Sequence, residues 1–179
     1  MKEKEIIRKL QAGDENEVEH IVKENYPFVY SYLYRRCGNQ DIAKELTQET
    51  FYKFFQNIHS YEPKGKLLNY LYRIALHLFY DETRKRKFYT DEEIDFNQLK
   101  DEKESVQETI NRKQKIKDVR EILKKLPSQH QDILIFRFYQ ELKFKDISTI
   151  TGLPVSTLKS RYQAALKLVE QYWKEGEGS

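Results

Sequence analysis

The amino-acid sequence predicts an all-α protein with two small helical domains joined by an acidic linker, the second a helix-turn-helix domain. Its 179 residues include only four prolines and six glycines, so little interrupts long helices. Apolar residues recur at helical spacing, with no strand-like alternation and no internal repeat. The expected domains are residues 1–88 and 109–179, with residues 89–108 as the linker.

Four helices are expected in residues 1–88. A short amphipathic helix closes near Gly13, and Asp14 with Glu17 forms the pattern of a capping box that starts a longer helix. The Gly38-Asn39 pair interrupts this second helix, and a third one follows. The segment 60–65 is the clearest loop, and a fourth helix is predicted over residues 66–87.

The net charge of +3 is unevenly distributed. Lys and Arg minus Asp and Glu give −1 for residues 1–65, +4 for residues 66–88, −6 for residues 89–108 and +6 for residues 109–179. The acidic, poorly periodic segment is therefore the predicted linker. Two basic blocks suggest two contacts with a polyanion, although solvated basic faces are common on helical proteins and charge alone decides nothing.

The second domain contains a helix-turn-helix pattern. One amphipathic helix stops at Leu126-Pro127, and the next begins at Ser128, with Gln131 completing a capping box. Residues 144–150 then form a short helix, and Gly152 lies in a tight turn before a second helix.

One face of this second helix is apolar, and the opposite face carries hydrogen-bonding and cationic groups suited to base edges and phosphates. For Arg161, which lies between the faces, an ion pair with Asp146 is as plausible as a phosphate contact. A generic two-helix corner also mimics the pattern, but the glycine and the polar face favour DNA. The expected DNA-binding residues are Ser156, Thr157, Lys159, Ser160, Arg161, Gln163 and Lys167.

Nothing in the sequence indicates an enzyme, a metal site or a cofactor. The four histidines are scattered, Cys37 is the single cysteine, and no glycine-rich phosphate loop occurs. One cysteine excludes an internal disulfide and fits a reducing compartment. With no membrane-length apolar run and no signal-peptide pattern at the N-terminus, we expect a cytoplasmic protein.

The stretch Leu123–Leu168 resembles the fourth conserved region of bacterial sigma factors of the extracytoplasmic-function class. That family has a leucine-proline corner, here Leu126-Pro127, and an acidic-Ile-small step, here Asp146–Ser148. Its recognition helix typically reads Thr-Val-Lys-Ser-Arg, which corresponds to Thr157–Arg161. Response regulators also contain a helix-turn-helix, so the first domain decides the family.

The first domain is similar to the second conserved region of the same family. Asp41–Phe51 resembles the core-polymerase-binding helix with its Gln-Glu-x-Phe signature. Asn69–His77, followed by Asp81 and Arg84, resembles the segment that melts and reads the minus-ten element. Both regions occur in the family's order and spacing, and together they cover nearly the whole chain.

The resemblance implies an alternative sigma factor that binds core RNA polymerase and directs promoter-specific transcription initiation. The first domain would bind core polymerase and open the minus-ten element, and the second would bind the minus-thirty-five element. The acidic linker is either a solvated tether or, by resemblance, a segment directed toward the RNA exit path. Further expectations are an anti-sigma factor, soluble or membrane-anchored, and a monomeric free chain. The residues implied to contact core polymerase are Asp41, Glu45, Gln48, Glu49 and Phe51.

On the helix 66–87, aromatic rings are interleaved with cations opposite the apolar positions. Rings stack on unpaired bases for about 1–3 kcal/mol per base, and cations follow the backbone. Tyr72 and Phe79 are interpreted as core residues, whereas Tyr70 and Tyr80 are interpreted as DNA contacts rather than core. By resemblance, the loop 60–66 captures a base flipped from the non-template strand. The expected DNA-binding residues here are Lys64, Asn69, Tyr70, Arg73, His77, Tyr80 and Arg84.

The sequence departs from the family pattern at five positions, which leaves the promoter sequence open. Glu45 replaces the usual Asp, Tyr70 the usual Trp and His77 the usual Asn. Ala164 and Leu166 stand where Arg is usual, so fewer phosphate contacts and a shallower salt dependence are expected.

Two other function classes are a stand-alone helix-turn-helix regulator and a helical adaptor that binds acidic proteins. The helix containing Gln48 and Glu49 discriminates between them and a sigma factor, because only a sigma factor needs it for transcription.

Overall fold

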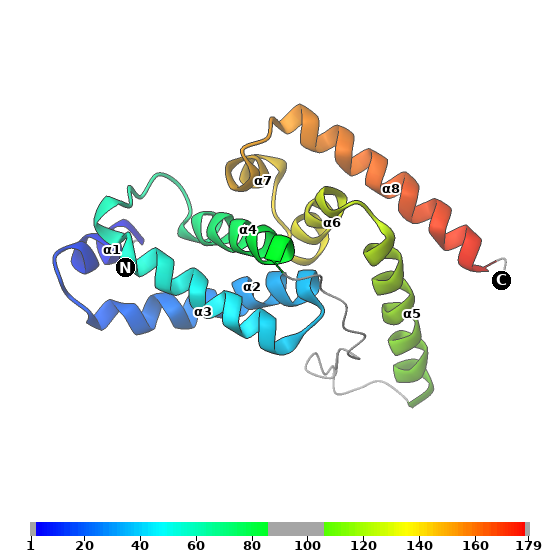
Figure 1. The fold of residues 1–179 in the computed structure, drawn as a ribbon, viewed down its shortest axis with the longest axis horizontal. Helices are drawn as coiled ribbons and strands as arrows, with labels where there is room; N and C mark the ends of the chain where they lie inside the picture. Colours follow the sequence, from blue (N-terminus) through cyan, green and yellow to red (C-terminus); the bar gives the residue numbers. More distant parts are fainter. Residues whose placement is uncertain (1–2, 86–105, 178–179) are drawn as a thin grey trace.

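The computed structural model describes residues 3–85 and 106–177, and every regular element in these ranges is helical (Figure 1). This confirms the all-α prediction. Most of the predicted linker, residues 89–108, lies outside the described residues, and its last three residues already belong to helix α5. We refer to residues 3–85 as lobe 1 and to residues 106–177 as lobe 2.

Lobe 1 contains four α-helices and one short 3₁₀ turn. They are α1 (Glu3–Gln11), α2 (Asn16–Cys37), α3 (Gln40–Gln56), η1 (Ile58–Ser60) and α4 (Leu67–Lys85). α2 ends as predicted at Gly38, which adopts φ +68° and donates its N–H to the carbonyl of Tyr34. The side chain of Asn39 then caps α3 by accepting from the N–H of Ile42 at 3.0 Å. This glycine-asparagine pair turns the chain so that α2 and α3 pack as a hairpin.

Lobe 2 contains four α-helices and one π-helical turn. They are α5 (Val106–Lys125), α6 (Ser128–Leu134), η3 (Ile135–Tyr139), α7 (Phe144–Thr151) and α8 (Val155–Glu177). The tight turn between α7 and α8 contains Gly152, which has φ +76° and donates its N–H to the carbonyl of Ser148. The hydroxyl of Ser148 in turn donates to the carbonyl of Leu153 at 2.6 Å. The predicted helix-turn-helix is therefore present and locally braced.

Both predicted capping boxes are wrong, because their polar side chains have other partners. The Asp14 carboxylate accepts from the N–H of Asn16 at 3.1 Å, and α2 has no side-chain cap. The amide of Gln131 donates to the carbonyl of Leu126 at 2.9 Å, while the hydroxyl of Ser128 accepts from Arg36 of lobe 1. The helices nevertheless start within two residues of the predicted positions.

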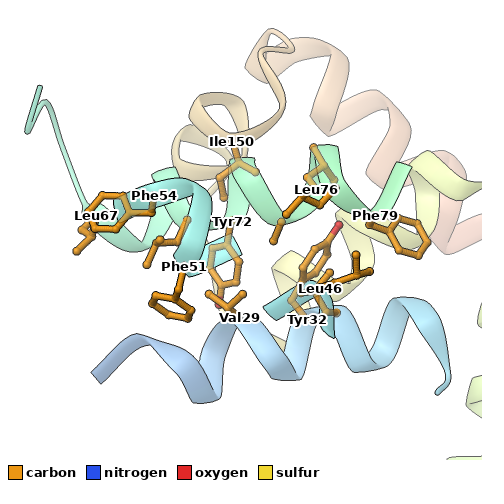
Figure 2. Close-up of a cluster of buried hydrophobic side chains, with 14 of the residues drawn as sticks. Val29, Tyr32, Leu46, Phe51, Phe54, Leu67, Tyr72, Leu76, Phe79 and Ile150 are labelled. Carbon is orange, nitrogen blue, oxygen red and sulfur yellow. The ribbon is translucent and has the colours of Figure 1, made fainter. Parts of the chain in front are cut away.

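The two lobes pack against each other and share one hydrophobic core. α7 lies over α4, and the π turn η3 packs against α2 (Figure 1). The ring of Phe136 from η3 is fully buried, 4.6 Å from the ring of Tyr32 and 5.4 Å from that of Tyr72. Figure 2 shows Ile150 reaching from α7 toward α4 in the same cluster. The sequence did not predict this contact between the lobes.

Candidate nucleic-acid and polymerase interfaces

The recognition helix α8 leaves its predicted DNA-facing side open. Leu158 and Ala165 are fully buried and hold the helix against the rest of lobe 2. On the opposite side, Thr157 and Arg161 are half-buried at the edge of the exposed surface. The exposed members of the predicted set are Ser156, Lys159, Ser160, Gln163 and Lys167. This face combines hydroxyl, amide and ammonium groups without a carboxylate, a composition that suits the major groove.

Arg161 does not form the alternative ion pair with Asp146. Within the described residues, the Asp146 carboxylate instead contacts lobe 1, with Lys66 Nζ at 3.3 Å and Asn69 Nδ2 at 2.9 Å. Burial lowers the pKa of His130, and the charge of Arg161 lowers it further, so the guanidinium lies near His130. Arg161 is thus left at the edge of the recognition face.

The residues of α4 that were predicted to bind DNA lie on two different sides of the helix in the structure. Arg73, His77 and Arg84 are exposed, and Tyr70 is half-buried beside them. The ring of Tyr70 lies 4.6 Å from that of Tyr61, which braces it against the loop 61–66. These four residues form what we call the outer face of α4.

A cavity of about 200 Å³ opens on this outer face between α3 and α4. Its lining includes Tyr70, His77, Lys53 and Asn57. An aromatic ring next to amide, imidazole and ammonium groups suits an unpaired base, which is held by stacking and by hydrogen bonds to its edge. Lys64, in the neighbouring loop, is exposed and pairs with Glu62.

Asn69 and Tyr80 turn toward lobe 2, so the prediction that they share an open face with Arg73 and His77 is wrong for this conformation. Asn69 is buried and donates to Asp146. The hydroxyl of Tyr80 donates to Asp132 at 2.5 Å. Burial raises the pKa of Tyr80, and the Asp132 charge raises it further. Helical spacing brings both residues beside the core positions that carry the inter-lobe contact, which the sequence alone did not reveal.

Asp132 on α6 is a buried carboxylate surrounded by lobe 1. It accepts hydrogen bonds from the hydroxyl of Tyr32 at 2.9 Å and from that of Tyr80. The Arg36 Nε lies 2.6 Å from its Oδ1, without the angle of a hydrogen bond, so this contact is an ion pair. Burial alone would lower the pKa of Arg36, but the Asp132 charge, together with Tyr32 and Tyr80, outweighs burial and raises that pKa. No sequence motif marked this cluster.

The predicted polymerase-binding residues on α3 are only partly on the surface. Asp41, Glu45 and Gln48 are exposed and Glu49 is half-buried. Phe51 is buried, and its ring stacks on that of Tyr26 at 6.1 Å. The ring of Phe51 is therefore unavailable to a partner in this conformation, and its packing on Tyr26 holds α3 in position.

Tyr52 is a candidate for the same surface that the sequence interpretation missed. Its side chain is 58% exposed, and its position four residues after Gln48 puts it on the same side of α3. Gln56 donates to its hydroxyl at 2.8 Å. In the sequence, the signal that would have identified Tyr52 was an aromatic residue one helical turn after a polar residue of the predicted interface, because aromatic residues often carry binding energy.

The described residues contain no group of three or more His, Cys, Asp or Glu side chains arranged to hold a metal ion. The one thiol is buried, and burial raises the pKa of Cys37 to about 12, so it is protonated at neutral pH. None of the helices in the described ranges is long and apolar enough to cross a membrane.

The fold is that of an all-helical, two-lobed helix-turn-helix protein. Comparison with known proteins identifies its family. The Sigma-70 region 2 model matches residues 21–89, and the Sigma-70, region 4 model matches residues 116–169. The RNA polymerase sigma factor YlaC of Bacillus subtilis is 30% identical over 163 residues, covering 89% of this chain and 94% of that protein.

The ECF RNA polymerase sigma factor SigW of Bacillus subtilis is 27% identical over 167 residues, covering 88% of this chain and 89% of its own length. Among solved structures, the sigma factor RpoE in complex with the anti-sigma factor NepR from Bartonella quintana matches with a TM-score of 0.68 and 20% identity, over 87% of this chain and 96% of that one. The chain therefore belongs to the sigma-70 family, as an RNA polymerase sigma factor of the extracytoplasmic-function class. The resemblance seen in the sequence is confirmed.

Proposed function

We propose that this chain is an alternative sigma factor that binds core RNA polymerase and directs promoter-specific transcription initiation. The observation that carries the proposal is the presence of both sigma-70 regions on one chain, in order and over most of its length. Sigma factors act by binding and are not enzymes, so the chemistry of RNA synthesis belongs to the polymerase.

In this proposal the exposed part of α3 docks on the polymerase. Asp41, Glu45 and Gln48 supply acidic and amide groups, and Tyr52 supplies an aromatic ring on the same side of the helix. Such a mixture is typical of an interface in which an aromatic residue contributes much of the binding energy and polar groups fix the orientation. Phe51 and Tyr26 hold the helix in place from the core.

The two DNA contacts have different tasks. The exposed face of α8 reads the minus-thirty-five element as a duplex, where Lys159 and Lys167 contact phosphates and Gln163 and Ser160 contact base edges. The outer face of α4 holds the melted minus-ten strand, with Tyr70 as the stacking ring and Arg73 and Arg84 along the backbone. Stacking of about 1–3 kcal/mol per base is comparable to the free energy needed to extract a base, so opening is driven by binding.

The proposed partners are core RNA polymerase, promoter DNA and an anti-sigma factor. Support for the last comes from the solved complexes of RpoE with NepR and of CnrH with the cytosolic domain of CnrY, which this chain resembles in fold. The CnrH match has a TM-score of 0.69 at 14% identity and covers 95% of this chain and 96% of that one. The proposed function also requires that the chain act in the cytoplasm, as a monomer until it binds polymerase.

A binding assay with purified core RNA polymerase distinguishes a sigma factor from a stand-alone regulator. We expect the fluorescently labelled chain to form a stoichiometric complex with core polymerase, and Gln48→Ala combined with Glu45→Ala to weaken it at least tenfold. Gln171→Ala is the matched control, because Gln171 is exposed on α8 and its amide donates to Glu175 of the same helix. A variant that binds polymerase as tightly as the wild type would refute the assignment of α3.

A further inference from the structure

Helix α1 forms hydrogen bonds with both ends of the loop between η1 and α4. At the start of the loop, the side-chain amide of Gln11 donates to the carbonyls of Ile58 and Tyr61, each at 2.8 Å. At the end of the loop, the Glu3 carboxylate accepts from the N–H of Leu67 at 2.8 Å. Glu3 is the first residue of α1 and Gln11 is the last. One helix therefore holds both ends of this loop.

α1 is fixed to the rest of lobe 1 by its apolar side. Ile6, Ile7 and Leu10 are buried in the core, and α1 packs against both α2 and η1 (Figure 1). The groups that Gln11 and Glu3 bind in the loop are backbone carbonyls and a backbone N–H. These bonds constrain the path of the chain itself, so α1 determines where the loop begins and where it ends.

The start of the loop carries an aromatic ring that packs beside the cavity on the outer face of α4. Tyr61, whose carbonyl accepts from Gln11, is buried. Its ring lies 5.5 Å from that of Phe54 and 4.6 Å from that of Tyr70. Tyr70 is the aromatic residue that lines the cavity of about 200 Å³. A shift of the backbone at Tyr61 therefore moves a ring that contacts the proposed stacking residue.

The middle of the loop is held mainly by local contacts. The N–H of Lys64 donates to the carbonyl of Glu62 at 2.7 Å, and the two exposed side chains form an ion pair. Gly65 adopts φ +105°, and a Cβ there would meet nothing within 4 Å. Lys66 reaches Asp146 of lobe 2 at 3.3 Å through an exposed side chain, a kind of ion pair that contributes little. Contacts of this kind shape a turn, and the bonds from α1 fix its place on lobe 1.

We propose that Gln11, together with Glu3, is a positioning residue for base selection at the minus-ten element, because it fixes the loop beside the base cavity. This inference rests on the proposed function, since it takes the outer face of α4 as the single-strand surface. Gln11 needs no DNA contact of its own and acts through the backbone and ring of Tyr61. A binding site discriminates only when its groups are held within about 0.5 Å of the productive geometry, so a loosened loop accepts bases that the wild type rejects.

The chemistry of the two side chains determines which substitutions test this role. The Gln11 amide has two donor hydrogens, and it uses them on two carbonyls. Gln11→Met keeps an unbranched side chain of similar length but removes both donors. Glu3→Leu removes the acceptor for the N–H of Leu67. Glu3→Gln is the conservative variant, because its amide oxygen still accepts that hydrogen bond.

The first measurement is hydrogen exchange of the free full chain, followed by mass spectrometry of the peptide 58–70. Gln11→Met and Glu3→Leu are each expected to raise exchange in this peptide by about fivefold or more, and Glu3→Gln is expected to exchange as the wild type. Asn25→Ala is the matched control. The Asn25 amide also donates to a backbone carbonyl at 2.8 Å, but to that of Ile21 on its own helix. Unchanged exchange in α2 and α3 shows that the variants keep their fold.

The second measurement is the base preference of the complex with core RNA polymerase. Promoter fragments randomised in the minus-ten element are bound by the complex of each variant, and the bound fragments are sequenced. Gln11→Met and Glu3→Leu are expected to lower the preference for the best base at one minus-ten position by about fivefold or more. Glu3→Gln and Asn25→Ala are expected to keep the preference of the wild type. Preference at the minus-thirty-five element should stay unchanged in all variants, because α8 reads it.

The outcomes separate this inference from the proposed function. Unchanged exchange in the peptide 58–70 would refute the role of α1 in holding the loop. Faster exchange without a change in base preference would refute the role of Gln11 and Glu3 in selection. Equal losses of preference at both promoter elements would show a general loss of stability and would also overturn the inference. A wild type without any base preference would refute the proposed function, whereas faster exchange in the variants would still support the contact between α1 and the loop.

Discussion

The buried pair of Arg36 and Asp132 allows the strength of lobe docking to be measured. Their side chains are 2% and 5% exposed, and their nearest charged atoms are 2.6 Å apart. Removing one member of such a pair leaves the other charge buried and unpaired, which costs about 3–5 kcal/mol. We therefore expect Asp132→Asn and Arg36→Met each to lower the free energy of unfolding by several kcal/mol. The loss cannot exceed the free energy of docking, because an undocked chain returns the charge to water.

The double variant distinguishes a coupled pair from two independent losses. Once both charges are gone, the second substitution removes no interaction with the first, so the double variant should lose less than the sum of the single losses, by about 2 kcal/mol or more. Urea denaturation at pH 7, followed by circular dichroism, gives the four free energies. Single losses that add to within about 0.5 kcal/mol would contradict the ion pair as the centre of the contact.

Three further predictions concern the turn, the recognition helix and the effect of pH. Gly152→Ala should destabilise the chain by about 1–2 kcal/mol through its left-handed φ alone, since a Cβ there meets nothing within 4 Å; thermal unfolding measures this, and a neutral result would contradict the strain. Gln163→Ala should change base preference in a promoter-library binding assay, whereas Lys167→Ala should weaken all sequences alike and lower the salt slope by about one; a uniform loss for Gln163→Ala would contradict its assignment to bases. Burial would raise the pKa of Asp146, but hydrogen bonds from Asn69 and Lys66 outweigh burial and lower that pKa. The contribution of Asp146 to the packing of the two lobes is therefore present above its ordinary pKa and is lost as the pH falls through the lowered value. Fluorescence energy transfer between dyes attached to the two lobes through Lys23→Cys and Gln171→Cys should therefore decrease in that acidic range. The decrease should be smaller in Asp146→Asn, and equal decreases would exclude this carboxylate as a cause.

Local patterns were sufficient to predict most of the helices and the helix-turn-helix. Gly38 and Gly152 end helices because both adopt positive φ, and glycine tolerates this conformation best. Apolar spacing of three and four identified the buried sides of α4 and α8. The capping boxes failed because a side chain that matches a local motif also has distant partners available, as the bond between Ser128 and Arg36 shows.

The contact between the lobes could not be predicted from one sequence. Asp132 pairs with Tyr32 across 100 positions of the chain, and Asn69 pairs with Asp146 across 77. No periodicity links residues at such distances, and each looks like an ordinary polar residue in its own segment. For the same reason, Tyr80 was interpreted as a free stacking ring.

The division of α4 into an outer face and a side covered by lobe 2 also depends on tertiary packing. Spacing alone puts Asn69, Tyr70 and Arg73 on one broad polar side of the helix. Asn69 is nevertheless buried against α7, whereas Arg73 is exposed. Tyr52 shows the converse, since spacing alone did not distinguish this aromatic residue, which is 58% exposed, from its buried neighbour Phe51.

Run-off transcription with purified core RNA polymerase tests the central claim most directly. Genomic promoter fragments are transcribed with core polymerase alone, with the added wild type and with the added Gln48→Ala, Glu45→Ala variant. We predict discrete start sites that require the wild type and are lost with the variant, while Gln171→Ala behaves as the wild type. If no start site depends on the protein, although it is folded and binds core polymerase, it is not acting as a sigma factor.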